Sequence, residues 1–68
     1  MSELQTKIID LFKSKDETYL TCRDITWELK KNPMHIGKSL KTLTLMGKIK
    51  DCYTEYPSDN ITYYFLND

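Results

Sequence analysis

The segment from Ile36 to Ile49 constrains the fold more than any other part of the chain. Its apolar residues Ile36, Leu40 and Leu43 are separated by four and three positions, and Gly47 follows after four more. This spacing places them on one face of a helix, and a glycine there is typical of a helix C-terminus. Lysines occupy the opposite face. The segment therefore predicts a helix with a buried seam and a charged outer surface, followed by a strand.

Two helices are predicted before this segment. Ser2 and Gln5 have the spacing of a capping box, and the apolar positions that follow predict a helix over residues 3–14. Thr21 is a suitable N-cap for a second helix over residues 22–30, with an acidic residue in its first turn. The short stretch 19–21 between them is too short for a helix, and it is either a brief strand or an extended link.

The start of the third helix is marked by Asn32 and Pro33. Asparagine is a good N-cap, and proline suits the first helical position because no amide hydrogen is needed there. We therefore expect this helix to cover residues 33–46, separated from the second only by residues 31–32, which is the tight connection of a helix-turn-helix. Gly37 lies inside it and costs up to about 1 kcal/mol relative to alanine, so a small residue has a reason to be there.

The C-terminal third predicts a β-hairpin. Residues 49–55 and 61–66 are rich in β-branched and aromatic side chains, and residues 56–60 between them have turn chemistry, so we expect a five-residue loop. On the second strand, Ile61, Tyr63 and Phe65 alternate with three other residues and are expected to face the core. The 68 residues have room for one domain, residues 1–68, in the α+β class.

The charges are separated along the chain, although the net charge is zero. Residues 1–28 contain six acids and four bases, residues 29–50 contain six lysines and no acid, and residues 51–68 contain four acids and no base, which gives −2, +6 and −4. A patch of one sign creates a local field even on a neutral protein. We expect function to follow the basic segment around the third helix.

The order helix, short strand, helix, tight turn, helix, hairpin resembles the winged helix-turn-helix superfamily over essentially the whole chain. The third helix resembles that of small prokaryotic, archaeal or viral regulators of the MarR, ArsR and Lrp groups, through Ile36, Leu40, Leu43, Gly47 and Ile49. The layout is also similar to the winged helices that bind Z-form nucleic acid. Their characteristic asparagine and tyrosine are replaced here by Gly37 and Lys41, so Z-form recognition is not expected.

The resemblance implies that the third helix enters the major groove of double-stranded DNA. Lys38 and Lys41 would then contact guanine edges or phosphates, His35 and Thr42 would add hydrogen bonds, and Gly37 would permit close approach. Asn32 and the free amides at the helix start would hold a phosphate. The flanking bases are expected to act as phosphate clamps; they are Lys30, Lys31, Lys48 and Lys50.

The wing is less suited to DNA than the helix. It has no arginine or lysine at its tip, and only Tyr56 and Asn60 could hydrogen-bond to a phosphate. Glu55 and Asp59 would be repelled by the DNA backbone. We expect the wing to stand clear of DNA or to contact a protein, and Asp59→Lys to tighten DNA binding if the tip lies near the backbone.

Three functions remain open from the sequence. The first is a sequence-specific transcriptional regulator that binds DNA as a homodimer. The second is a protein-interaction winged helix, favoured by the acidic wing, and the third is non-specific architectural binding.

Trp27 and Leu45 lie off the apolar faces of their helices and either cover the edge of the core or, for Trp27, join a dimer interface. The candidate partners of Trp27 in that interface are Leu4, Ile9 and Tyr19.

Catalysis and cofactor binding are not expected. One histidine and two cysteines thirty residues apart provide no metal site, and no glycine-rich phosphate loop is present. The N-terminal residues lack the basic and apolar regions of a signal peptide, and no apolar stretch approaches the roughly 18 residues of a membrane span. We therefore expect a cytoplasmic protein, with Cys22 and Cys52 reduced.

Overall fold

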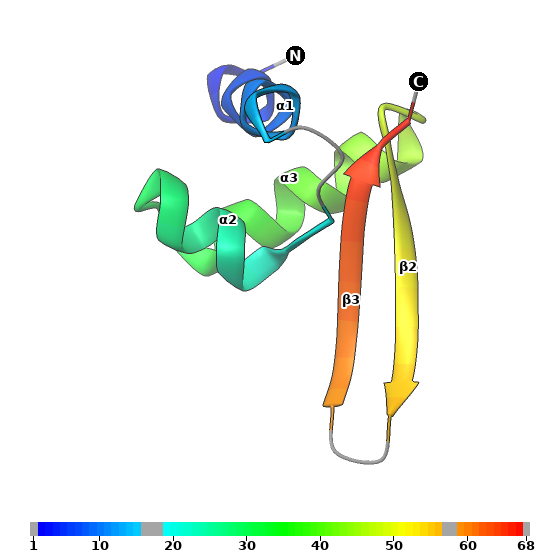
Figure 1. The fold of residues 1–68 in the computed structure, drawn as a ribbon. Helices are drawn as coiled ribbons and strands as arrows, with labels where there is room; N and C mark the ends of the chain where they lie inside the picture. Colours follow the sequence, from blue (N-terminus) through cyan, green and yellow to red (C-terminus); the bar gives the residue numbers. More distant parts are fainter. Residues whose placement is uncertain (1, 16–18, 57–58, 68) are drawn as a thin grey trace.

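The computed structural model describes residues 2–15, 19–56 and 59–67, and it describes side chains outside 53–60. The elements in chain order are α1 (Glu3–Ser14), β1 (Leu20–Thr21), α2 (Cys22–Leu29), α3 (Pro33–Leu45), β2 (Ile49–Tyr56) and β3 (Asp59–Leu66). The helices gather at one end, and the β2–β3 hairpin extends away from them (Figure 1). The described residues thus form an α+β fold with three helices and a three-stranded antiparallel sheet.

The predicted helix starts are confirmed, because each has the hydrogen bonds of a cap. The Ser2 backbone N–H donates to Gln5 Oε1 at 3.0 Å, and the Gln5 N–H donates to Ser2 Oγ at 3.2 Å. Thr21 and Asp24 exchange the same pair of bonds at 3.0 Å each, so α2 also begins with a full capping box. Each box satisfies two backbone amides that a helix start otherwise leaves to water.

The ends of α2 and α3 differ by one residue from the prediction. Lys30 has a left-handed backbone (φ 54°) and therefore ends α2 at Leu29 instead of continuing it. Helix α3 ends at Leu45, and Gly47 follows with φ 75°, where a side chain would be strained. The N–H of Lys48 bonds to the carbonyl of the third-last helical residue at 3.0 Å, which is the Schellman arrangement that glycine permits.

The core lies where the three helices meet the near end of the sheet. The predicted seam of α3 is confirmed, because Ile36, Leu40 and Leu43 are fully buried. They pack with one another and with residues from each of the other helices and two strands; these are Ile8, Ile9, Phe12, Leu20, Ile25 and Ile49. Burial of this single apolar cluster is the main favourable term in folding such a small domain.

The strands of the hairpin are longer than predicted. Pairing continues outward to Tyr56 and Asp59, which leaves only residues 57–58 between the strands, so the expected five-residue loop is wrong. The turn chemistry of residues 56–60 indicated a loop, but Glu55 pairs with Asn60 and Tyr56 pairs with Asp59, so the ladder includes residues 56, 59 and 60. Pairing between the two strands of the hairpin prevails over the turn preference of these residues.

The face of β3 that meets the core is also opposite to the prediction. Buried Ile49 pairs with Leu66, and buried Leu20 pairs with Tyr64, so these four residues share the inner face. Phe65 lies on the outer face, where its ring meets that of Tyr19 edge-on at 5.2 Å. Aromatic residues occupy both faces, so alternation alone did not determine which face is buried.

The register places Tyr64 on the inner face, next to the core, and this position changes the pKa of its hydroxyl. Burial raises the pKa of the Tyr64 hydroxyl above its usual value, and the negative forms of Cys22 and Asp51 raise it further. Cys22 is half-buried and Cys52 is exposed, and both are free thiols.

Candidate nucleic-acid interface

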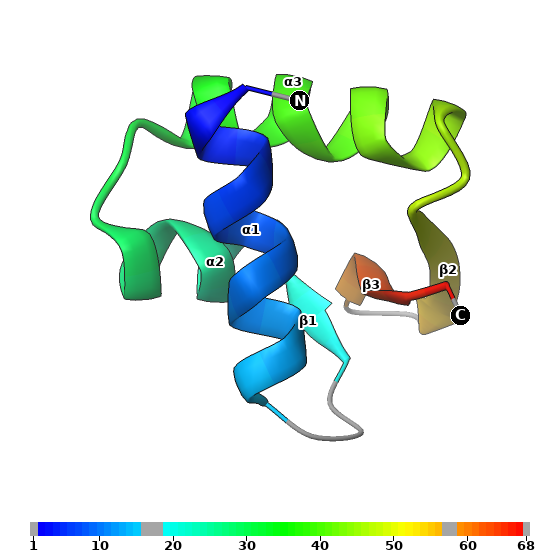
Figure 2. The same cartoon turned by 90° about the horizontal axis from the view of Figure 1, so that it is seen from above.

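The outer side of α3 has no partner within the described part of the chain. Figure 2 shows α3 along one edge of the molecule, with α2 and the sheet on one side of it and α1 crossing over it. Met34, Lys38, Lys41 and Leu45 are spaced by four, three and four positions, opposite to the buried seam, and all four are exposed. They form a stripe, hereafter the α3 outer stripe, with two lysines between two apolar residues.

The lysines of the α3 outer stripe are not neutralised by neighbouring acids. The ion pairs of the described residues join Lys7 to Glu3 and Lys15 to Glu28, at 3.4 and 3.2 Å, and both lie outside α3. Lys38 and Lys41 are exposed and form no ion pair with any residue whose side chain is described. Two like charges one turn apart repel each other, so they stabilise the fold less than a paired arrangement would.

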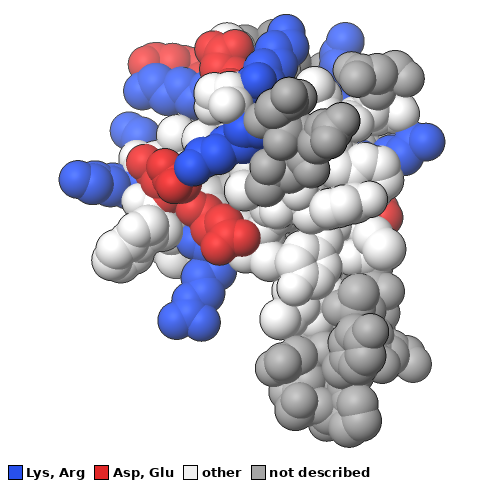
Figure 3. Space-filling model, in the orientation of Figure 1, with Lys and Arg blue, Asp and Glu red and all other residues white. Residues whose placement is uncertain are grey.

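The flanking lysines lie at both ends of α3. Lys30 and Lys31 occupy the connection before the helix, Lys48 lies between the helix and β2, and Lys50 is the second residue of β2; all four are exposed. The face in Figure 3 is different, because acidic and basic side chains lie next to one another over its helical part, and α3 lies at the back of that view. The lysines that flank α3 are therefore placed by the chain at the two ends of this helix.

The amides at the start of α3 are not free, contrary to the prediction. Asn32 Oδ1 accepts the N–H of Met34 at 2.9 Å, and the Asn32 carbonyl accepts the N–H groups of His35 and Ile36 at 3.0 and 3.1 Å. Pro33 has no N–H to offer. A phosphate at this end would have to replace the Asn32 side chain or accept from its amide nitrogen.

Two more predicted contact residues are exposed on α3, and a third is a half-buried glycine. His35 is exposed, and Thr42 is exposed with its hydroxyl donating to the Lys38 carbonyl at 3.1 Å, which leaves the hydroxyl oxygen free to accept. A Cβ added to Gly37 would meet no atom within 4 Å, so no packing in the chain requires a glycine there. The side chains of Tyr56 and Asn60 lie outside the described residues.

The prediction that Trp27 and Leu45 cover the core edge is wrong. Trp27 is 82% exposed and Leu45 is 80% exposed, and neither belongs to the core cluster. The partners considered for Trp27 in a dimer are also constrained, because Ile9 is buried and Leu4 packs against the core. Only Tyr19 remains largely exposed, at 58%.

Clusters of metal-binding side chains and membrane-spanning helices are absent from the described part of the chain. Among those residues, no group of three or more histidine, cysteine, aspartate or glutamate side chains is arranged to hold a metal ion. No helix in the same ranges has the length and apolar character needed to cross a membrane. Within the described ranges, the α3 side is marked by exposed lysines that form no ion pair.

Comparison with known proteins yields a match in fold. No protein-family model and no curated protein matches the sequence. Among solved structures, the chain is similar to dissimilatory sulfite reductase D (DsrD), determined by neutron crystallography, with a TM-score of 0.75 and 19% sequence identity. The match covers 98% of this chain and 94% of that one, so the two folds agree from end to end.

Proposed function

We propose that the chain is a winged helix-turn-helix domain that binds double-stranded DNA, with α3 in the major groove, as a small transcriptional regulator. The observation that carries the proposal is the α3 outer stripe: Lys38 and Lys41 project from an exposed helix face without a described acidic partner. A major groove admits an α-helix, and lysines contact guanine edges and phosphates there.

The lysines around α3 support the same proposal. Six lysines and no acid lie between residues 29 and 50, and the four outside the helix lie just before and just after it. A duplex presents two rows of phosphates on either side of the groove, so cations at both ends of a docked helix are well placed to meet them. Local charge of this kind attracts nucleic acid although the whole chain is neutral.

Gly37 supports close approach of a ligand to α3. A glycine inside a helix costs up to about 1 kcal/mol relative to alanine. A Cβ added there would meet no atom of the described neighbouring elements within 4 Å, so packing against them does not call for a glycine. A glycine at this position would allow a partner to come close to the helix backbone, where a side chain would keep it away. The wall of a DNA groove is a partner of this kind.

A second candidate function is a protein-interaction winged helix. It is favoured by the acidic C-terminal segment, which has four acids and no base over residues 51–68. The structurally similar protein DsrD is named after a sulfite reductase, and its name mentions no nucleic acid. Under this alternative, the lysines of α3 would meet an acidic protein surface instead of phosphates, or the acidic hairpin would meet a basic one.

The salt dependence of binding distinguishes these functions. A fluorescently labelled random duplex is titrated with the protein at several salt concentrations, and binding is followed by anisotropy. If α3 and its flanks neutralise about four to six phosphates, log K falls against log salt with a slope of about −4 to −5 per monomer. A specific site, selected from a random pool, should then exceed the random duplex in affinity by at least about 10³-fold.

Two results would contradict the proposal. One is the absence of binding to any duplex at low salt, which would favour a protein partner. The other is binding with a flat salt dependence, because contacts to phosphates release counterions and cannot be independent of salt. Equal affinity for selected and random duplexes would instead indicate architectural binding.

A further inference from the structure

The outer side of α2 presents a tryptophan beside a depression. Trp27 is 82% exposed, and it lies four positions after Arg23 on the same side of the helix. Ile25 lies two positions from both Arg23 and Trp27 and is fully buried. Residues two positions apart lie on nearly opposite sides of a helix, so Trp27 and Arg23 point away from the core. An open depression of about 440 Å³ lies next to them. The depression is lined by Lys15, Leu20, Arg23, Asp24, Trp27 and Glu28, and these six residues are hereafter the Trp27 surface.

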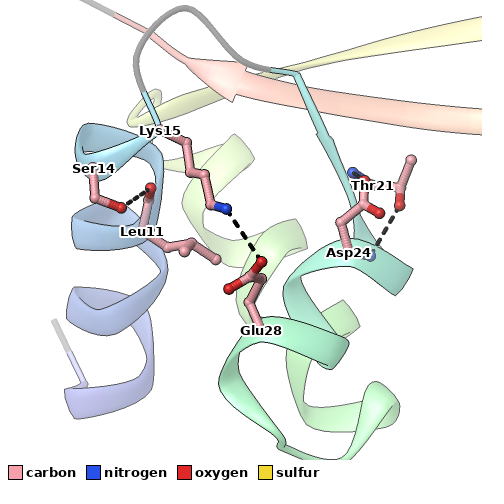
Figure 4. A network of polar contacts seen from close by, with 6 residues as sticks. All are labelled: Leu11, Ser14, Lys15, Thr21, Asp24 and Glu28. Atoms are coloured by element: carbon pink, nitrogen blue, oxygen red, sulfur yellow. Dashed lines mark hydrogen bonds and ion pairs between the residues drawn. The ribbon is translucent and has the colours of Figure 1, made fainter.

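The Trp27 surface contains equal numbers of acids and bases. Lys15 at the end of α1 is held by Glu28 of α2 at 3.2 Å, and Asp24 accepts the N–H of Thr21 through one carboxylate oxygen (Figure 4). Arg23 forms no ion pair with a residue whose side chain is described. The surface thus offers the guanidinium of Arg23 and the second carboxylate oxygen of Asp24. The two residues are adjacent in α2.

We infer that the Trp27 surface is a homodimer interface, in which Trp27 of each copy occupies the depression of the other. A two-fold interface places the same patch on both subunits and must therefore be complementary to itself. A patch with two bases and two acids meets this condition, because Arg23 of one copy can face Asp24 of the other in both directions. Tryptophan is among the residue types most enriched at the anchors of such interfaces.

The charge balance disfavours other occupants. A nucleic acid would meet two carboxylates on the Trp27 surface, and a strongly acidic or basic protein would meet two like charges. A second copy of this neutral chain meets neither obstacle. The two surfaces also lie on different helices: α2 contacts α3, and it buries Ile25 while Trp27 is exposed. The proposed dimer is therefore expected to leave the α3 outer stripe free.

The interface is expected to be weak. Six residues are fewer than the roughly 20–30 per side of a stable standard interface. A dissociation constant in the micromolar range is therefore expected, and the dimer should dissociate on dilution. Trp27 is the only tryptophan of the chain, so its fluorescence reports directly on this surface.

The test combines sedimentation velocity with tryptophan fluorescence over a dilution series of the whole chain. We expect the sedimentation coefficient to fall on dilution, and the emission maximum to move to longer wavelength over the same concentrations as Trp27 becomes hydrated. Trp27→Ala should weaken association by about tenfold or more. Its matched control is Leu45→Ala, which removes an equally exposed apolar side chain from α3 and should leave the dimer unchanged.

Arg23→Glu provides a variant that retains both the fold and the fluorophore. An acid in the first turn of α2 interacts favourably with the helix dipole, so thermal stability of the diluted monomer should not fall. The same change gives the surface three acids and one base, and association should weaken. A chain that is monomeric at every concentration would overturn the inference, as would a dimer that Trp27→Ala and Arg23→Glu leave intact. DNA binding by α3 is measured separately and does not depend on either result.

Discussion

Replacing both Lys38 and Lys41 with glutamine is expected to weaken binding to duplex DNA on the order of 10- to 100-fold and to reduce the salt slope by about two. The two side chains are exposed on one side of α3 without a described acidic partner. Their removal therefore eliminates two cations from the proposed contact surface and relieves a like-charge pair within the helix. Anisotropy titrations at several salt concentrations measure both quantities.

The matched control is Lys7→Gln with Lys13→Gln on α1. These lysines are also exposed on a helix, and the double replacement changes the net charge by the same amount. If binding depended only on overall charge, the control would lose as much affinity as the α3 variant. Equal losses in the two proteins would contradict the placement of DNA on α3, and circular dichroism would show that both remain folded.

Leu40→Ala is expected to lower the free energy of unfolding by about 2–5 kcal/mol. Leu40 is fully buried at the centre of the α3 seam, so its truncation removes apolar burial and leaves a cavity. A domain of 68 residues has a total stability of only about 3–10 kcal/mol. The loss is therefore a large fraction of the total, and urea unfolding followed by circular dichroism should show a midpoint at a much lower urea concentration than in the unchanged protein.

Leu45→Ala on the same helix is the control for this experiment. Leu45 is 80% exposed, so the same chemical change should alter the free energy of unfolding by no more than about 0.5 kcal/mol. A loss for Leu45→Ala comparable to that for Leu40→Ala would mean that the outer side of α3 is buried, and it would contradict both the core and the proposed contact surface.

Local chemistry made the helices predictable from the sequence. Ser2, Thr21 and Asn32 each cap a helix as expected, because their side chains bond to amides two or three residues away and need no distant partner. The seam of α3 followed from spacing alone. The one-residue difference at Lys30 arises because a left-handed lysine is uncommon and leaves no clear signal in sequence.

The hairpin was less predictable because its geometry depends on pairing between distant residues. The inner face of β3 is fixed by Ile49 opposite Leu66 and by Leu20 opposite Tyr64. Neither partnership is visible in the alternation of β3 itself, which has aromatic residues on both faces. A register shifted by one residue exchanges the two faces, so only the neighbouring strands decide which side is buried.

The candidate site was predictable in its outline and not in its hydrogen bonds. The exposure of Lys38, Lys41 and His35 follows from their angular positions around a helix whose buried face is known. The occupation of the α3 amides by Asn32 required the cap geometry itself. The exposure of Trp27 was missed because a tryptophan at the border of an apolar face is more often covered by its own chain.

The most direct test of the proposed DNA surface is amide chemical-shift mapping of the ¹⁵N-labelled protein during titration with a short duplex. The proposal predicts that the signals of Lys38 and Lys41 shift most, together with those of His35 and Thr42, while the signals of α1 remain in place. If the duplex leaves the α3 signals unchanged, or moves signals of α1 or the hairpin instead, α3 is not the DNA-contacting helix and the proposed function is wrong.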